Sequence, residues 1–181
     1  MSYLIGAMPT QIRYYILKII FFLCLAVNAQ GSNNHDIEKV RDSIENFLVK
    51  ASNSINRTEL EKAMANIIIA KDLAIDYADR ISRARTNMAL AKLYRELGDS
   101  EKAEEEILNA IRIQTEDKYN SSLAYSKLIY ASIAIELDKF EIAKNSLNEA
   151  ELISTKEYNK ELEGAIKLYR GLLELEQENP K

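Results

Sequence analysis

The chain has 181 residues, with 24 lysines and arginines against 28 aspartates and glutamates, and its formal net charge is −4 at pH 7. This acidic balance lacks the strongly basic surface that nucleic acids and anionic membranes attract, so we expect neither as a partner. Only one cysteine, Cys24, and one histidine, His35, are present, which argues against a disulfide and against thiol or zinc chemistry.

The segment 1–29 has the composition of a secretory signal peptide. It contains no Asp or Glu, and the basic residues Arg13 and Lys18 precede a short apolar run over residues 19–27 and a small residue, Ala29, at a cleavage position. The run is well below the roughly 20 residues that cross a bilayer. We therefore expect an exported protein, periplasmic or secreted after cleavage. An uncleaved membrane anchor is the alternative, and only in that case do we expect contact with a membrane.

The rest of the chain is almost free of residues that break helices. Between residues 32 and 179 it contains no proline and only three glycines, Gly98, Gly164 and Gly171, and it is rich in Ala, Leu, Ile, Glu and Lys. This composition predicts an all-α protein.

Local patterns place the expected helices in chain order. Apolar residues at steps of three and four up to Ala51 predict the first helix, and Thr58 with Glu61 three residues later predicts a capping box that opens the second. Gly98 predicts a turn with a left-handed glycine. The polar stretch 115–120 predicts a longer connection between helices. The expected helices start at Asp36, Thr58, Asp79 or Ser82, Ser100, Ser121, Lys139 and Lys156.

Three alanines, Ala63, Ala103 and Ala143, are evenly spaced, because 103 − 63 and 143 − 103 both equal 40, and we call this interval the period. In each case an apolar residue follows after four positions and a second alanine after seven, which places all three on one face of a helix. A recurrence of about 20–50 residues is typical of a repeat array, which usually presents a surface to a partner. The three sets are Ala63, Ile67, Ala70; Ala103, Ile107, Ala110; and Ala143, Leu147, Ala150.

One segment, 84–116, combines a small residue in its first helix, a tyrosine three positions later, a Gly-Asp turn and two alanines in its second helix. The residues are Leu90, Ala91, Tyr94, Leu97, Gly98, Asp99, Lys102, Ala103, Ile107 and Ala110. This pattern resembles a tetratricopeptide (TPR) repeat, with Asn87 where the family has tryptophan and without the closing proline. The resemblance covers about 36–181. It implies an all-α, right-handed superhelical solenoid of about three hairpins plus a C-terminal helix, and another helical-hairpin repeat is the alternative.

In TPR proteins the first helix of each hairpin lines the concave face, so the resemblance implies a groove there. Tyrosine and arginine are common anchors at interfaces. The alternative is that Met88, Tyr125 and Leu128 only pack between repeats. The peptide-carboxylate clamp of the family uses lysine and asparagine here, and it is not supported, because this chain has Met88 and Lys92 and then Ile129 and Ser132. The candidate partner-binding residues are Arg85, Met88, Lys92, Arg95, Tyr125, Leu128, Ser132 and Ile135.

The last expected helix differs from the others because its apolar surface is broad and no further helix follows it up to Lys181. We expect either self-association through this helix, giving a homo-oligomer, or a continuation of the array beyond the sequence. The expected divisions are a signal peptide at 1–29, a flexible leader at 30–35 and a TPR-like domain at 36–181, with units of about 36–80, 81–120 and 121–155 and a terminal helix at 156–178.

The sequence offers no arrangement for catalysis. His35 has no second histidine or cysteine near it, no Ser/His/Asp set can be assembled, and the glycines form no phosphate loop. The carboxylate runs over 104–106 and 174–178 are typical of a solvated helix face. We therefore expect no enzyme activity, cofactor or metal, and a scaffold or adaptor that binds a protein or peptide through its concave face. The alternative is the sensor or input segment of a longer membrane-anchored signalling protein, a kinase or a transcriptional regulator.

Overall fold

The computed structural model describes residues 36–178, and the chain divides into two units, Met1–Val40 and Arg41–Lys181. Of the first unit only residues 36–40 are described, and these are helical. The expected signal peptide at 1–29, the leader at 30–35 and His35 lie outside the described residues. The second unit contains the helical repeats.

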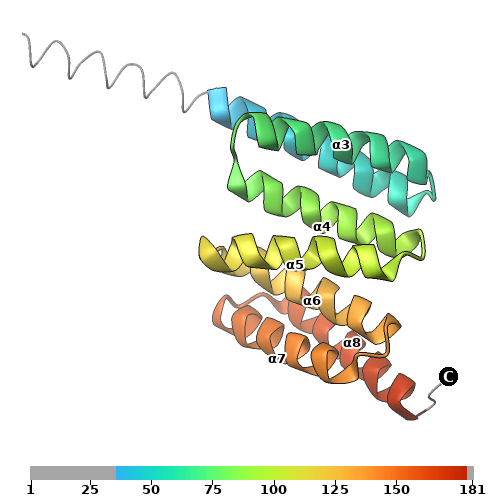
Figure 1. Cartoon of the computed structure of the whole chain (residues 1–181). Helices are drawn as coiled ribbons and strands as arrows, with labels where there is room; N and C mark the ends of the chain where they lie inside the picture. The colour runs from blue at the N-terminus through green and yellow to red at the C-terminus, as the bar shows by residue number, and fades with distance from the viewer. Residues whose placement is uncertain (1–35, 179–181) are drawn as a thin grey trace, which may run out of the picture. The chain divides into compact units, whose positions relative to one another are not determined.

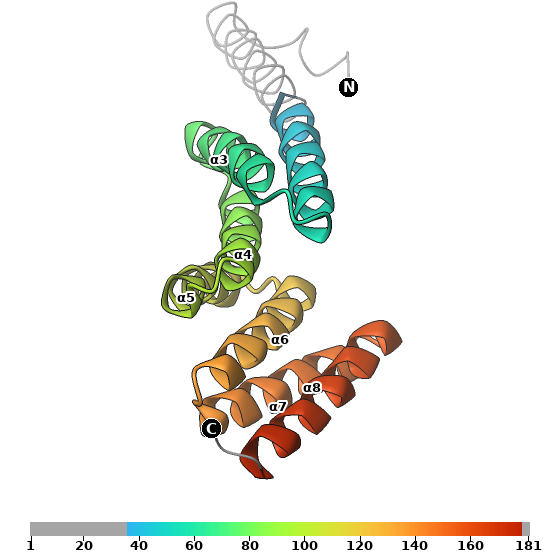
Figure 2. The same ribbon diagram turned by 90° about the vertical axis from the view of Figure 1, so that its right-hand side faces the viewer.

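The described part of the chain contains seven helices and no strand, which confirms the all-α prediction. Neighbouring helices run antiparallel and pack in consecutive pairs (Figures 1 and 2). The first helix covers residues 36–56, of which the part from Arg41 belongs to the second unit. The others are α3 (Leu60–Asp76), α4 (Arg80–Glu96), α5 (Ser100–Glu116), α6 (Asn120–Glu136), α7 (Phe140–Lys156) and α8 (Lys160–Glu178).

The period consists of two helices of equal length with their turns. Each helix from α3 to α7 has 17 residues, and the turns between them are equally short, so successive helices start at a constant interval of half a period. The prediction of a long connection over 115–120 is therefore wrong. The polar residues at its start continue α5, because the hydroxyl of Thr115 donates to the carbonyl of Ile111 and Glu116 pairs with Arg112 one turn earlier.

The turns between the described helices share one backbone geometry. In each turn a backbone N–H donates to the carbonyl five residues earlier, in the last turn of the preceding helix. After α4, for example, the N–H of Asp99 donates to the carbonyl of Tyr94 at 2.9 Å, and this arrangement is a Schellman motif. The preceding residue takes a positive φ, and for Gly98 this confirms the prediction of a left-handed glycine. Thr58 also has a positive φ, so it belongs to the turn after the first helix, and the prediction that it caps the second helix is wrong. The positive-φ residues are Thr58, Ala78, Gly98, Lys118, Asp138 and Tyr158.

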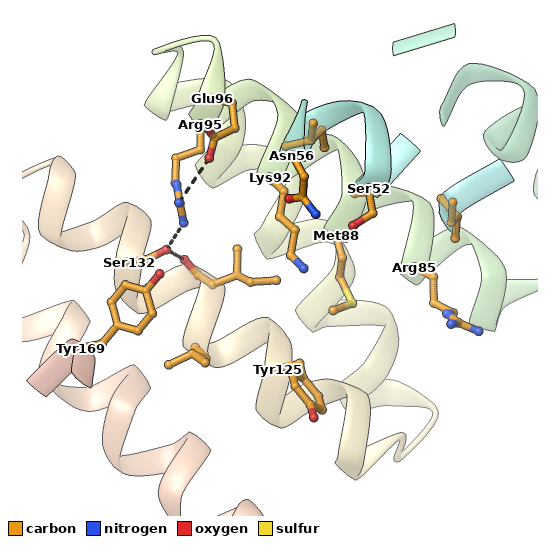
Figure 3. Close-up of a pocket in the computed structure, with 15 residues that line it drawn as sticks. Ser52, Asn56, Arg85, Met88, Lys92, Arg95, Glu96, Tyr125, Ser132 and Tyr169 are labelled. Carbon is orange, nitrogen blue, oxygen red and sulfur yellow. Dashed lines mark hydrogen bonds and ion pairs between the residues drawn. The ribbon is translucent and has the colours of Figure 1, made fainter. Parts of the chain in front are cut away.

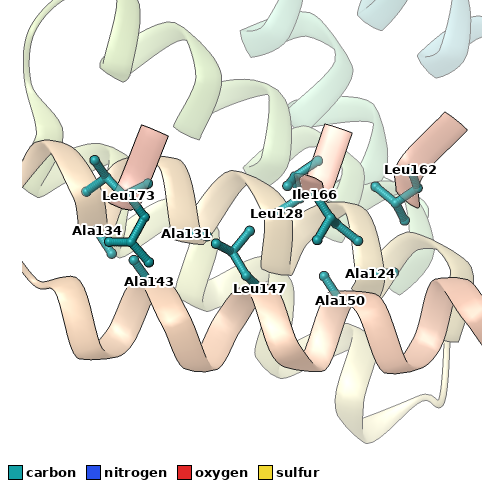
Figure 4. Close-up of a cluster of buried hydrophobic side chains, with 11 residues drawn as sticks. Ala124, Leu128, Ala131, Ala134, Ala143, Leu147, Ala150, Leu162, Ile166 and Leu173 are labelled. Carbon is teal, nitrogen blue, oxygen red and sulfur yellow. The ribbon is translucent and has the colours of Figure 1, made fainter. Parts of the chain in front are cut away.

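The repeated alanines, which were predicted to share one helix face, form the contact within each hairpin. In the third hairpin the small residues Ala124 and Ala131 of α6 meet α7, and Leu147 fills the space between the two helices (Figure 4). In the second hairpin Ala91 of α4 meets α5 in the same way. Small side chains at these points let the helices approach closely and exclude water from the contact. Every member of the three sets is completely buried: Ala63, Ile67, Ala70, Ala103, Ile107, Ala110, Ala143, Leu147 and Ala150.

Charged side chains connect successive repeats. The guanidinium of Arg41 in the first helix holds both carboxylate oxygens of Asp79, at 2.7 and 3.0 Å, and Ser82 donates to the same carboxylate. Asp79 is buried, and the hydrogen bond from Arg41 is the main cause that lowers its pKa. Further along the stack, Lys139 pairs with Glu104 at 2.5 Å. These pairs fix the register of one hairpin against the next.

Candidate binding groove

A cavity of about 440 Å³ lies on the side of the stack formed by the first helix, α4, α6 and α8, which we call the inner face (Figure 3). Each of these four helices contributes side chains, whereas α3, α5 and α7 contribute none. The first helix, α4, α6 and α8 are every second helix of the chain, and they meet at this one cavity, whereas α3, α5 and α7 are the outer helices.

The predicted partner-binding residues come together in this cavity, with one exception. Ile135 lies in the core contact between α6 and α8 and lines a smaller neighbouring pocket of about 190 Å³ together with Leu172. Leu128 belongs both to that core and to the cavity wall, so this residue packs between repeats and also faces the groove. The predicted residues that line the cavity are Arg85, Met88, Lys92, Arg95, Tyr125, Leu128 and Ser132.

The sequence prediction missed several residues of the wall, and the repeat itself could have located some of them. Leu48 and Ser52 of the first helix stand one period before Met88 and Lys92, and they line the same cavity. Tyr169 of α8 stands one period after the wall residue Ile129. Carrying the predicted positions one period back would have located Leu48 and Ser52, whereas Tyr169 follows only from Ile129, which was not among the predicted residues.

The two arginines of the groove are engaged with other groups of the protein. Arg85 pairs with Glu45 of the first helix at 2.5 Å. Arg95 donates to the hydroxyl of Ser132 at 2.9 Å (Figure 3). It also pairs with Glu136 at 3.3 Å, and both contacts link α4 to α6. Both arginines therefore hold neighbouring repeats together as well as lining the cavity.

Lys92 is different, since no carboxylate of the described residues lies within ion-pair distance of its ammonium group. Its side chain keeps contact with water but is enclosed by the walls of the cavity. This partial desolvation lowers the pKa of Lys92, and the nearby charge of Arg95 lowers it further. The cavity therefore contains a cation that can still donate hydrogen bonds to a ligand.

An apolar floor surrounds this lysine. Met88 of α4 and Leu128 and Tyr125 of α6 line the same cavity as Lys92, and Figure 3 shows Met88 and Tyr125 on the same side of it as the lysine. Behind Met88, the amide of the fully buried Gln114 donates to the methionine sulfur at 3.2 Å and fixes that side chain. The combination of apolar area, aromatic rings and a few polar groups is typical of sites that bind ligands or peptides.

Two carboxylates of the run over 104–106 pair with lysines of neighbouring helices or turns. Glu104 accepts from Lys139 and from the hydroxyl of Tyr130, and Glu106 lies 3.9 Å from Lys71, with its pKa raised by burial.

Among the described residues no cluster of His, Cys, Asp and Glu could hold a metal ion. None of the described helices is both long enough and apolar enough to cross a membrane.

Antiparallel helices packed in consecutive pairs, with one inner face, define an all-α helical-repeat protein. Residues 84–117 match the family model of the tetratricopeptide repeat, and this match and the consecutive helices fit a TPR-type repeat protein. The matched span covers most of α4 and all of α5. No curated protein and no solved structure matches the chain. TPR repeats generally mediate protein–protein interactions, and this fold is typically non-catalytic.

Proposed function

We propose that the protein is a non-catalytic scaffold that binds a segment of another protein in the inner-face groove. The observation that carries this proposal is the convergence of four alternate helices on one cavity, in which the ammonium group of Lys92 pairs with no described carboxylate. A scaffold of repeats offers a wide, preformed surface. On binding, the partner segment loses conformational freedom and the scaffold does not, which lowers the entropic cost of the complex.

The groove has separate places for separate parts of a bound chain. Met88 and Leu128 offer apolar area for a side chain of the partner. Lys92 offers its ammonium group to an acceptor such as a backbone carbonyl or a carboxylate, and the tyrosines offer large, rigid contact area. Because Arg85 and Arg95 are already paired within the protein, we expect Lys92 to contribute more to recognition than either arginine.

Photo-crosslinking tests the proposal and identifies the partner. A photoreactive amino acid replaces Tyr125, which is exposed in the groove, and a control carries it at Leu108 on the outer helix α5. We expect one protein to be captured from the source cells through position 125 and not through position 108.

Binding of the captured partner to purified variants then measures the role of the groove. We expect Lys92→Glu and Tyr125→Ala each to weaken binding about tenfold or more, which is the size of an interface hot-spot effect. Lys144→Glu, on the exposed side of α7, changes the charge equally and should leave binding unchanged. Binding that survives both groove variants and is lost in Lys144→Glu would show that the outer face is the site instead.

We also propose that the protein acts outside the cytoplasm, on the basis of the sequence pattern of residues 1–29. The exported protein should begin at Gln30 or within a few residues of it, because a small residue, Ala29, precedes this position after the apolar run. The intact mass of protein recovered from the exported fraction measures the cleavage site. Recovery of the full-length chain in the membrane fraction would support an uncleaved anchor and contradict this proposal.

A further inference from the structure

One face of α8 is apolar and exposed to solvent. Leu168, Leu172 and Leu175 are exposed over 72%, 38% and 56% of their surface, and they follow one another at steps of four and three along the helix. Gly164 and Gly171 lie in the same row, and a Cβ atom built on either would meet nothing within 4 Å. The opposite side of α8 is buried, since Ile166 and Leu173 pack into the core with α6 and α7 (Figure 4).

The earlier repeats show what normally covers this face. Ala131 stands one period before Gly171 and Ala91 stands two periods before it, and both alanines are completely buried against the second helix of their own hairpin. Leu128, which stands one period before Leu168, is only 9% exposed because α8 packs on α6. The open face of α8 therefore has the side-chain pattern that other helices cover elsewhere in the same chain.

The pattern on the open face is complementary to itself. Gly164, Leu168, Gly171 and Leu175 alternate small and large residues at steps of four, three and four, which is the spacing of one seam of a helix pair. In an antiparallel pair centred between residues 169 and 170, each Leu168 lies opposite Gly171 of the second copy. Each Leu175 then lies opposite Gly164, so each large side chain has a small one facing it.

The charges beside this seam also favour an antiparallel pair. In the same alignment Lys167 comes close to Glu174 of the second copy, and Lys160 comes close to Glu178. None of these four side chains has an ion-pair partner among the described residues. In a parallel pair each seam residue would meet its own copy, so Leu168 would face Leu168 and Gly171 would face Gly171, and the large and small side chains would no longer be matched.

We propose that α8 is a self-docking helix, through which two copies of the protein form a two-fold symmetric antiparallel dimer. A two-fold interface requires a surface that is complementary to itself, and the seam of α8 meets this requirement. The contact is small, because a helix of 19 residues is about 28 Å long and stable complexes bury about 1,200–2,000 Å². Glu161 also approaches Glu178 of the second copy at each end of the seam. We therefore expect a weak dimer, with a Kd on the order of 10–100 µM.

Analytical ultracentrifugation of the full chain over a range of concentrations tests this proposal. We expect a monomer–dimer equilibrium for the wild type, and an increase in Kd of about tenfold or more for the variant Leu168→Glu/Leu175→Glu. The matched control is Ile142→Glu/Leu152→Glu, which changes two exposed apolar residues of α7 and should leave the equilibrium unchanged. Circular dichroism checks that each variant keeps the helical content of the wild type.

A charge exchange tests the antiparallel arrangement without removing any apolar group. Lys167→Glu should weaken the dimer, and Lys167→Glu/Glu174→Lys should restore it, since the attractive pair forms again with reversed signs. If the wild type stays monomeric at several hundred micromolar, the proposal is wrong, and the exposed face of α8 would instead bind a helix of another protein. A dimer that is insensitive both to the leucine changes and to the charge exchange would place the contact elsewhere and overturn it equally.

Discussion

Two helices, α4 and α8, have equivalent places in the repeat and differ in what covers them. The helix α4 packs against α3, α5 and α6, and its small residues Ala84 and Ala91 are buried. Among the labelled helices α8 packs mainly against α6 and α7, and at the equivalent positions Gly164 and Gly171 an added Cβ atom would meet nothing within 4 Å. The repeat pattern determines which positions of a helix face a neighbour, and the presence of that neighbour determines whether they are buried.

The largest expected difference lies between the two sides of α8 itself. Ile166 is completely buried, so Ile166→Ala should remove about 2–5 kcal/mol from the free energy of unfolding by losing apolar contact and leaving a cavity. Leu168 is mostly exposed, and Leu168→Ala should change it by no more than about 0.5 kcal/mol at concentrations where the protein is monomeric. Urea unfolding measures both. Equal losses would mean that the face with Leu168 is covered in the isolated chain.

The next effect concerns the small residues of the two helix faces. Ala103→Leu should cost about 1–3 kcal/mol, because the larger side chain cannot fit in the contact between α5 and α4. Gly171→Leu adds the same kind of side chain in open space and should be neutral or stabilising by up to about 1 kcal/mol, since glycine is a poor helix former. Unfolding at low protein concentration compares the two. A loss in Gly171→Leu as large as that in Ala103→Leu would contradict the open face of α8.

A third comparison uses the residues that precede the two helices, Asp79 before α4 and Asn159 before α8. Asp79→Asn should cost about 1–2 kcal/mol at pH 7 because it weakens the charged hydrogen bonds to Arg41. Asn159→Ala removes the bond from the N–H of Leu162 and should cost about 1 kcal/mol.

The pH dependence of these two variants should differ. The pKa of Asp79 is lowered in the folded protein, chiefly by Arg41, so its carboxylate stabilises the fold fully above the unfolded value near 3.8. This contribution is lost as the pH falls through the lower folded value. The difference between wild type and Asp79→Asn should therefore shrink in acid, whereas Asn159 does not titrate and its difference should stay constant. A difference for Asp79→Asn that does not change down to about pH 3 would contradict the role of the Arg41 bond.

Much of this fold could be predicted because the residues that repeat are those that pack. Alanines spaced one period apart located the contacts between helices, and the resemblance to the TPR repeat led to most of the groove. The end of α5 was mispredicted, since Thr115 and Glu116 are polar residues of a type common in loops but here complete the helix. Polar character alone does not end a helix when each side chain finds a partner along it.

The turns illustrate a second limit of sequence reasoning. Gly98 is a glycine, which adopts a positive φ readily. Thr58 and Tyr158 also have a positive φ, although a Cβ atom makes this conformation less favourable. Packing of the helices on both sides holds these residues in place, so only their regular spacing from Gly98 could have located them. The groove residue of α8, Tyr169, was missed for the same reason, because its role follows from its place in the period and not from its local sequence.

The smallest expected effects come from the turns that precede α5 and α8. Gly98→Ala should cost about 1 kcal/mol, because an added Cβ makes a positive φ less favourable although nothing blocks the space around it. Tyr158→Gly should stabilise the protein by up to about 1 kcal/mol, since it relieves the same strain in the native turn, partly offset by the greater freedom of glycine in the unfolded chain. Tyr158 is almost fully exposed, so little packing is lost by the change. Thermal and urea unfolding measure both variants, and opposite signs are expected. If both changes destabilise the protein, the turn before α8 does not carry the strain that its φ of 56° implies.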